Sequence, residues 1–171
     1  MLFRSMSTPV TIGSLTLPSA VMTAAGTAGY GPELAAYGNL ADLGAVVVKS
    51  LAAFPWAGNS APRVAASGED MLNAVGLAGP GVSAWRDNYL PRLHESGARV
   101  VCSIWGRTVE DYAEAARALR GADVVALEVN ASCPNLESAS SMFAHSADAT
   151  AAITRAATES GLPLWVKLSP N

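Results

Sequence analysis

The stretch VVALEVNASCPN, residues 124–135, decides how the rest of the sequence is interpreted. It begins with the apolar run Val124-Val125-Ala126-Leu127 and then turns polar, which is typical of a buried strand that ends in a loop. In that loop the carboxamides of Asn130 and Asn135 flank the thiol of Cys133. A carboxamide both donates and accepts hydrogen bonds, so this pair suits the amide or imide edge of a flat heterocycle, and the thiol is a candidate base.

A single cysteine in a turn does not establish chemistry, because unreactive buried cysteines are common. The other cysteine, Cys102, lies in the apolar run 100–104, where we expect an inert core residue. The two cysteines lack the spacing of metal ligands and do not suggest a disulfide framework. The interpretation of Cys133 therefore depends on the other strand ends.

Apolar runs typical of strands alternate with segments typical of helices, which indicates a parallel α/β fold. We expect strands at residues 20–22, 45–48, 100–104, 124–127 and 164–166, and helices at 32–37, 82–95, 108–119 and 148–160. Pro91 predicts a kink or break in the second helix, and a hairpin within residues 9–17 is expected to cover one end of the fold. The fold that we predict is a TIM (β/α)₈ barrel, of which this chain holds about the first five strands.

Both lysines of the chain fall at expected strand ends. Lys49 and Ser50 follow the strand at 45–48, and Lys167 follows the strand at 164–166. The chain has nine arginines and only these two lysines, so surface solvation does not readily explain their positions. In a barrel the carboxyl ends of the strands form the active face, which favours a functional site here. The small-residue loop at 23–29 would let a ligand approach the backbone closely.

The connection at residues 51–81 is unusually long and rich in Gly, Pro, Ala and Ser. Connections of this length are usually functional or disordered. Its segment Met71-Leu72-Asn73-Ala74-Val75-Gly76-Leu77 is apolar enough to pack against the body. We therefore expect a folded binding loop that carries Asn73.

We expect one globular domain over residues 1–171, in a cytosolic protein. Half of the residues are apolar and 15% are charged, which excludes a disordered chain. The formal charge of −3 provides no broad basic field and argues against a nucleic-acid partner. Residues 1–10 contain no apolar signal-peptide core, and no run reaches the length of a membrane span, so no membrane partner is expected.

Taken together, the motifs resemble a known family, the class 1 dihydroorotate dehydrogenases, which are flavin enzymes of pyrimidine biosynthesis. The resemblance covers nearly the whole chain and rests on Ala24-Ala25-Gly26-Thr27, Val48-Lys49-Ser50, Asn73-Ala74-Val75-Gly76-Leu77, Asn130-Ala131-Ser132-Cys133-Pro134-Asn135 and Val166-Lys167-Leu168-Ser169-Pro170-Asn171. Membrane-bound class 2 enzymes use a serine where this chain has Cys133. The segment Gly29-Tyr30-Gly31 looks more like class 1B, whose catalytic subunit works with a separate iron–sulfur flavoprotein that passes electrons to NAD.

The resemblance implies a role for each matching residue. Cys133 would be the catalytic base in the oxidation of dihydroorotate to orotate, with FMN as hydride acceptor. The pyrimidine ring would be bound by Lys49, Asn73, Ala74, Val75, Gly76, Leu77, Asn130 and Asn135. FMN would be contacted by Ala25, Lys49, Ser50, Ser103, Asn130 and Lys167. A homo-oligomer and a site without metal ligands are also expected.

Three residues depart from the class 1B pattern. Ala25 stands where these proteins usually have a serine that touches FMN, Ser103 replaces an asparagine, and Trp105 replaces a small residue. A complete barrel also needs about 250 residues, so we expect an N-terminal portion that lacks the strands around the flavin phosphate. Such a portion is not expected to bind FMN tightly or to turn over by itself.

Three other interpretations stay open at the level of sequence. A dihydropyrimidine dehydrogenase-like flavoprotein shares the cysteine loop but typically departs at the position of Asn135. A tRNA dihydrouridine synthase is also an FMN barrel, although the acidic balance of the chain disfavours an RNA partner. A barrel fragment without activity, acting only in assembly, is the non-enzymatic alternative.

Overall fold

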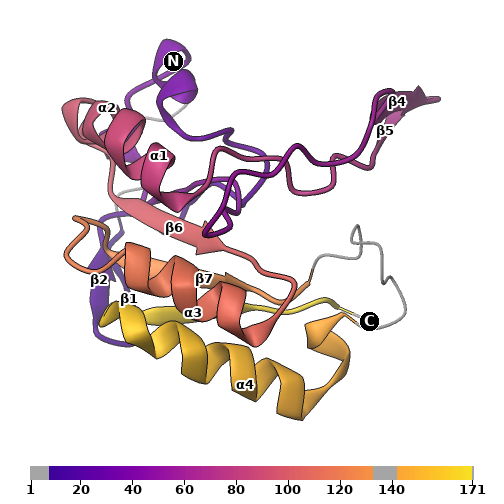
Figure 1. Ribbon diagram of the computed structural model, residues 1–171. Coiled ribbons are helices and arrows are strands. Elements are labelled where there is room, and N and C mark those ends of the chain that lie inside the picture. Colours follow the sequence, from indigo (N-terminus) through magenta and orange to yellow (C-terminus); the bar gives the residue numbers. More distant parts are fainter. Residues whose placement is uncertain (1–7, 133–141, 171) are drawn as a thin grey trace.

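A parallel sheet forms the centre of the fold in the computed structural model, which describes residues 8–132 and 142–170. Its strands lie in the order β3-β6-β7-β8. Figure 1 labels the two inner strands of this order, β6 and β7. Their bounds are β3 Val46–Val47, β6 Val100–Ile104, β7 Ala126–Asn130 and β8 Leu164–Lys167. Because these strands are parallel, their carboxyl ends meet at one edge of the sheet. The predicted parallel α/β architecture is confirmed.

The expected first strand, at residues 20–22, is reduced to a single parallel bridge between Met22 and Ala45. Beyond this bridge, the side chain of Thr23 bonds to the backbone of β3 at Val47. The hydroxyl of Thr23 accepts a hydrogen bond from the backbone N–H of Val47 at 2.8 Å and donates to the Val47 carbonyl at 3.1 Å. The segment therefore lies beside β3 without forming a longer backbone ladder.

The two faces of the sheet pack against different surroundings. Cys102 and Leu127 belong to the larger core cluster, which includes residues of the helices. Val101 and Ala126 belong to a smaller cluster on the opposite, inner face. Since successive strand residues alternate between faces, each strand contributes to both clusters.

Four α-helices and four 3₁₀ helices connect the strands in the described part of the chain. The α-helices are α1 Val82–Asn88, α2 Leu90–Glu95, α3 Val109–Ala118 and α4 Ala147–Ala157. The 3₁₀ helices are η1 Pro32–Ala36, η2 Leu40–Asp42, η3 Phe143–His145 and η4 Thr158–Ser160. Figure 1 shows α3 and α4 side by side along the sheet.

Local signals in the sequence account for the helix boundaries. The predicted break in the helix at 82–95 falls at Tyr89, two residues before Pro91. Thr108 and Asp111 form a reciprocal capping box at the start of α3, as their spacing predicts. After η4 the chain turns at Gly161, whose φ of 74° is the left-handed conformation typical of a helix end.

Two antiparallel hairpins lie outside the central sheet. The predicted N-terminal hairpin is confirmed: β1 Val10–Ile12 pairs with β2 Leu15–Leu17. Leu15 packs against the smaller core cluster, and the hairpin lies near the end where the central strands begin (Figure 1). The second hairpin, β4 Val64–Ser67 with β5 Asp70–Asn73, projects from the body on the side toward which the strands point (Figure 1).

The expectation that residues 71–77 pack against the body is wrong at its start. Met71 and Leu72 are 68% and 62% exposed. Both lie in a projecting two-stranded hairpin, whose side chains point alternately to two open faces. Only the end of the segment returns to the body, where Leu77 is buried beside Ala52 and Trp105.

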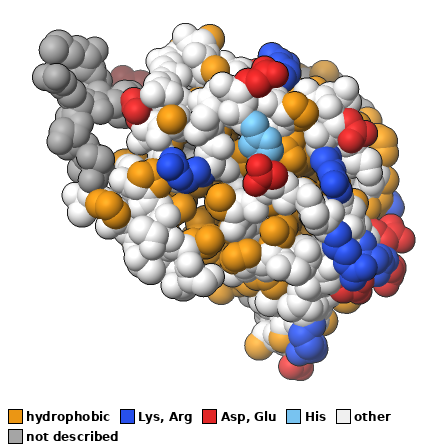
Figure 2. Space-filling model, turned by 90° about the vertical axis from the view of Figure 1, so that its left-hand side faces the viewer, with side chains coloured by type: hydrophobic (Ala, Val, Ile, Leu, Met, Phe, Trp, Pro, Cys, Tyr) orange, Lys and Arg blue, Asp and Glu red, His pale blue; other side chains and the backbone are white. Residues whose placement is uncertain are grey.

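Acidic and basic side chains are mixed on the surface. Figure 2 shows one face of the molecule, on which Lys and Arg side chains are interspersed with Asp and Glu side chains. Within residues 8–132 and 142–170, none of the helices combines the length and the hydropathy that crossing a membrane requires.

Candidate functional site

A polar network occupies the inner face of the sheet near the carboxyl ends of the strands. Ser103 of β6 lies opposite Glu128 of β7, and its hydroxyl donates to Glu128 Oε1 at 2.7 Å. Each of these residues follows an inward apolar residue, Val101 or Ala126, by two positions, so the alternation of the strand places it on the inner face. Glu128 Oε1 also lies 3.5 Å from Nζ of Lys167, at the end of β8.

The network continues toward β3 through a second hydroxyl and a carboxamide. Oγ of Ser50 lies 2.8 Å from Oγ of Ser103, and Asn130 Nδ2 donates to Ser50 Oγ at 2.9 Å. Asn130 Oδ1 accepts from the backbone N–H and the hydroxyl of Ser132 at 3.2 and 2.9 Å. Ser50, Ser103 and Asn130 are buried. The fold thus joins polar groups that are far apart in the sequence.

Helix α3 holds the backbone of Asn130 from the outer side of the sheet. The buried hydroxyl of Tyr112 donates to the Asn130 carbonyl at 2.7 Å. The ring of Tyr112 packs edge-on against Phe143, with 5.5 Å between centroids. These contacts hold the backbone of Asn130 at the end of β7.

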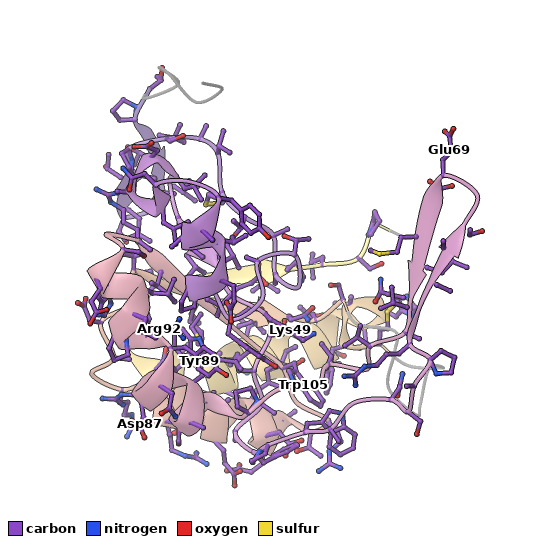
Figure 3. The ribbon with its side chains drawn as sticks, turned by 90° about the horizontal axis from the view of Figure 1, so that it is seen from above. Lys49, Glu69, Asp87, Tyr89, Arg92 and Trp105 are labelled. Carbon is purple, nitrogen blue, oxygen red and sulfur yellow. The ribbon has the colours of Figure 1, made fainter. Side chains whose placement is uncertain are left out.

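Lys49 is half-buried and follows β3, at the same edge of the sheet. Its backbone N–H donates to the carbonyl of Gly29 at 2.8 Å, which ties the loop at 23–29 to the end of β3. In Figure 3, Lys49 lies within the body of the molecule, whereas Glu69 marks the distant tip of the projecting hairpin. The structure therefore brings Lys49 and the network to one side of the fold.

The loop at 23–29 leaves open space beside the backbone of Gly26. Thr27 closes a turn by donating to the carbonyl of Ala24 from its N–H at 3.0 Å and from its hydroxyl at 2.7 Å. Gly26 has a φ of 91°, and a Cβ added there would meet no heavy atom within 4 Å. Ala25 packs against the smaller cluster and contributes no side-chain hydroxyl.

The predicted substrate-binding segment at 73–77 forms the base of the projecting hairpin. Asn73 ends β5 and is exposed. The carbonyls of residues 74–76 accept hydrogen bonds from the Asn59 amide at 2.8 Å, the Asn59 backbone N–H at 3.1 Å and the Trp56 indole at 2.9 Å. These bonds attach the hairpin to the body but do not by themselves establish a ligand site.

Trp105 forms an aromatic cluster just beyond the end of β6. Its ring centroid lies 6.1 Å from those of Phe54 and Trp56, and the guanidinium of Arg107 lies over the same two rings at 4.9 and 5.3 Å. Trp105 Nε1 is buried and has no hydrogen-bond partner within residues 8–132 and 142–170. The bulky residue at position 105 therefore forms an aromatic cluster two residues after Ser103 in the chain.

Of the two cysteines, only Cys102 lies within the described residues. Cys102 is completely buried on the helix-covered face, as predicted, and burial raises the pKa of its thiol, with a smaller contribution from the charge of Glu128. Cys133 and Asn135 lie outside the described residues. Among the described residues, no cluster of three or more His, Cys, Asp and Glu residues has the arrangement of a metal site.

Comparison with known sequences identifies the family. Residues 7–171 match the family model described as Dihydroorotate dehydrogenase. The chain belongs to the dihydroorotate dehydrogenase family.

Curated members of this family resemble the chain over nearly all of its length. A Desulforudis audaxviator protein is 45% identical over 168 residues, covering 97% of this chain and 55% of the relative. An Alkaliphilus metalliredigens protein is 42% identical over 163 residues, covering 95% of this chain and 54% of the relative. Both are described as Dihydroorotate dehydrogenase B (NAD(+)), catalytic subunit, so the predicted resemblance to class 1B is confirmed. The chain spans about half the length of these relatives.

A solved structure confirms the fold prediction. The dihydroorotate dehydrogenase of Eimeria tenella, crystallised with ferulenol, matches all of this chain and 55% of its own length with a TM-score of 0.71. Its sequence identity of 20% carries an inference about fold alone. The sheet and helices described above therefore correspond to about half of a dihydroorotate dehydrogenase barrel.

The residues at the carboxyl ends of the strands have a chemistry that suits the ring portion of FMN. Lys49 and Lys167 supply ammonium groups at one edge of the sheet, and the open space at Gly26 permits close approach of a flat ring. Lys167 lies 3.5 Å from Glu128 as an ion pair, and its ammonium group carries three hydrogens that can be donated. The hydroxyl proton of Ser103 is instead directed to Glu128, so this serine does not replace the asparagine expected there as a donor.

The sequence-based prediction of the site did not include Glu128, although this residue lies within the stretch 124–135. The strand alternates Leu127 and Val129 on the outer face with Glu128 and Asn130 on the inner face. The acidic residue in this period-two pattern was the available signal. Its partners, Ser103 and Lys167, belong to other strands and are apparent only in the folded chain.

Proposed function

We propose that the protein that carries this chain oxidises dihydroorotate to orotate with FMN as cofactor. The observation that carries the proposal is the convergence of a carboxamide, serine hydroxyls and an ammonium group at the carboxyl edge of the sheet, in a chain of the dihydroorotate dehydrogenase family. The site lies where a barrel of this kind performs its chemistry. FMN, when bound, supplies a hydride acceptor for C6 of the substrate.

Cys133 is the proposed general base. Its thiolate removes the proton from C5 of dihydroorotate while the hydride leaves from C6, and the C5–C6 double bond of orotate results. An ordinary cysteine has a pKa of about 8.5 and is partly ionised at neutral pH, so this role requires activation by its surroundings. The buried thiol of Cys102 is unsuited to the role, because burial raises its pKa and its side chain lies on the outer face.

The polar residues bind and orient the substrate and the flavin. We assign the pyrimidine ring of the substrate to Lys49, Asn130, Asn135 and the segment 73–77, and the flavin ring to Ala25, Lys49, Ser50, Asn130 and Lys167. Ammonium groups stabilise the negative charge that accumulates on the reduced ring. The buried hydrogen bonds of Asn130 and Ser50 hold the site rigidly before the ligand arrives, which lowers the cost of orientation.

A second protein is proposed as the route for the electrons. The similar proteins of Desulforudis audaxviator and Alkaliphilus metalliredigens are catalytic subunits by description, and their descriptions name NAD(+). We infer a separate iron–sulfur flavoprotein that transfers electrons from reduced FMN to NAD. Co-purification of the full-length gene product with such a flavoprotein, and NAD reduction only when both are present, would test this pairing.

Substitution of Cys133 tests the proposed reaction. Cys133→Ser in the full-length gene product should retain FMN and slow flavin reduction by dihydroorotate at neutral pH by about 10²–10⁴-fold, since a hydroxyl is a far weaker base. Stopped-flow absorbance at the flavin band measures this rate. Cys102→Ala is the matched control and should reduce flavin at the parental rate. Equal rates in Cys133→Ser and the parent would remove Cys133 from the base role.

Substrate choice distinguishes the proposal from the alternatives. A yellow full-length protein whose flavin is bleached by dihydroorotate and not by dihydrouracil supports dihydroorotate oxidation. Bleaching by dihydrouracil alone would instead support a dihydropyrimidine dehydrogenase-like reaction. A purified protein without flavin absorbance, and unable to bind added FMN, would contradict an enzymatic role.

A further inference from the structure

Glu128 is an acidic residue of the site for which the proposed reaction has no step. Its side chain is only 12% exposed. Its Oε1 atom accepts from the Ser103 hydroxyl at 2.7 Å and lies 3.5 Å from Nζ of Lys167. Because a carboxylate accepts hydrogen bonds and donates none, one end of the network is a pure acceptor.

The other end of the network is a pure donor. The backbone N–H of Ser132 donates to Asn130 Oδ1, which turns the amide so that Nδ2 faces Ser50. Each serine hydroxyl has one proton to donate, and Ser103 directs its proton to Glu128. Ser50 must then donate to Ser103 while it accepts from Asn130. Every bond from Ser132 to Glu128 therefore donates in the same direction.

We propose that Glu128 is a positioning residue with two effects. It orients the Asn130 amide through this chain of hydrogen bonds, and its negative charge offsets part of the positive charge of Lys167. The inference rests on the proposed function for its ligands. Oδ1 of Asn130 accepts from two donors of Ser132, and one N–H of Nδ2 donates to Ser50. The group that the amide offers to the substrate is therefore its second N–H. The substrate atom that faces Asn130 is therefore an acceptor, such as a ring carbonyl oxygen.

The carboxylate also affects the electrostatics of the cofactor site. It offsets part of the positive charge that Lys167 brings to the flavin ring, and so makes the reduced, negatively charged ring less stable than an unpaired lysine would. Hydrogen bonds aligned in one direction polarise one another. The charge of Glu128 therefore also strengthens the hydrogen bond from Asn130 to Ser50. Glu128 thus connects substrate orientation to the redox balance of the flavin.

Glu128→Gln tests the effect of the charge, because it preserves the size of the side chain and one acceptor oxygen. In the FMN-loaded full-length protein, the oxidised–reduced equilibrium should shift about tenfold toward reduced flavin, which is about 30 mV for a two-electron couple. Glu159→Gln is the matched control, since Glu159 pairs with Arg117 and Arg120. Equal midpoint potentials in the parent and both variants would overturn the influence of Glu128 on Lys167.

Ser103→Ala tests the orienting role and remains informative if Glu128→Gln fails to fold. It interrupts the chain between Glu128 and Ser50 but leaves the contact of Glu128 with Lys167. Orotate, titrated against the flavin spectrum, should bind about tenfold more weakly, while the flavin potential remains parental. Parental orotate affinity in Ser103→Ala would overturn the orienting role.

Thermal unfolding of the flavin-free protein tests the chain independently of the reaction. Ser103→Ala removes the hydrogen bond that Glu128→Gln weakens by replacing a carboxylate acceptor with a neutral amide, so the decrease in Tm of the double variant should be smaller than the sum of the single decreases. Additive decreases would contradict a continuous chain. Failure of the parent flavin to be reduced by dihydroorotate would instead contradict the proposed function, and would leave this comparison of Tm values valid.

Discussion

Cys102 should resist alkylation for as long as the protein is folded. The residue is completely buried on the helix-covered face, so a reagent such as N-ethylmaleimide reaches it only after local or global opening. Every 1.36 kcal/mol of opening free energy slows the reaction about tenfold, so an opening that costs about 4 kcal/mol slows it about 10³-fold relative to the unfolded chain. Mass spectrometry of the peptide that contains Cys102 measures the rate.

The same burial predicts a dependence of stability on pH. Burial raises the pKa of the Cys102 thiol above its value in the unfolded chain, which is about 8.5. Above that pH the unfolded chain releases a proton that the folded protein retains, so the free energy of unfolding should fall by up to about 1.4 kcal/mol per pH unit. Below the unfolded pKa this contribution is fully present and does not vary.

Cys102→Ala provides the control for the pH dependence. The variant lacks the thiol, so its urea-unfolding free energy should decrease less between pH 7.5 and 9.5 than that of the parent. The difference between the two proteins isolates Cys102 from all other ionisable groups, Cys133 included, because the parent and the variant share them. An alkylation rate within tenfold of the urea-unfolded rate, or equal pH slopes in parent and variant, would refute the reasoning.

Three further perturbations test the packing and the site. Gly44→Ala should prevent stable folding, because an added Cβ would lie 2.1 Å from a backbone carbonyl oxygen, whereas Gly38→Ala meets no atom within 4 Å and should yield parental amounts of soluble protein. Tyr112→Phe removes the hydroxyl that donates to the Asn130 carbonyl and should cost about 0.5–1.5 kcal/mol, measured as a lower Tm with unchanged secondary structure by circular dichroism. Lys49→Ala should weaken orotate binding in a titration followed by the flavin spectrum, and parental affinity would remove Lys49 from the substrate site.

Local sequence signals predicted most of the elements correctly. The capping box at Thr108 and Asp111 depends on residues three positions apart, so its geometry is encoded within one turn of helix. The apolar run at 100–104 became the fully buried strand β6 for a similar reason, since its composition suits no solvated segment. The expected strand at 20–22 was shortened because the Thr23 side chain competes for the hydrogen bonds of Val47, which lies in another strand.

The site was only partly predictable. The placement of Lys49, Asn130 and Lys167 at one edge of the sheet was predicted, because a parallel fold brings the carboxyl ends of its strands together; their roles remain predictions. The position of Met71 and Leu72 on a projecting hairpin was not, because apolar composition does not reveal whether a core lies within reach. Cys133, the proposed base, remains a prediction from the sequence motif.

The sequence by itself determined the alternation of strands and helices, the family and the candidate residues, because these depend on composition, spacing and motifs within short segments. Only the tertiary structure decided that Glu128 accepts a hydrogen bond from Ser103 and pairs with Lys167. It also decided that the hydroxyl of Ser50 accepts a hydrogen bond from the amide of Asn130. Those contacts depend on the register of neighbouring strands and on the face to which each residue points. Register is a relation between distant segments, and a shift of one residue would direct Glu128 into the helix-covered core.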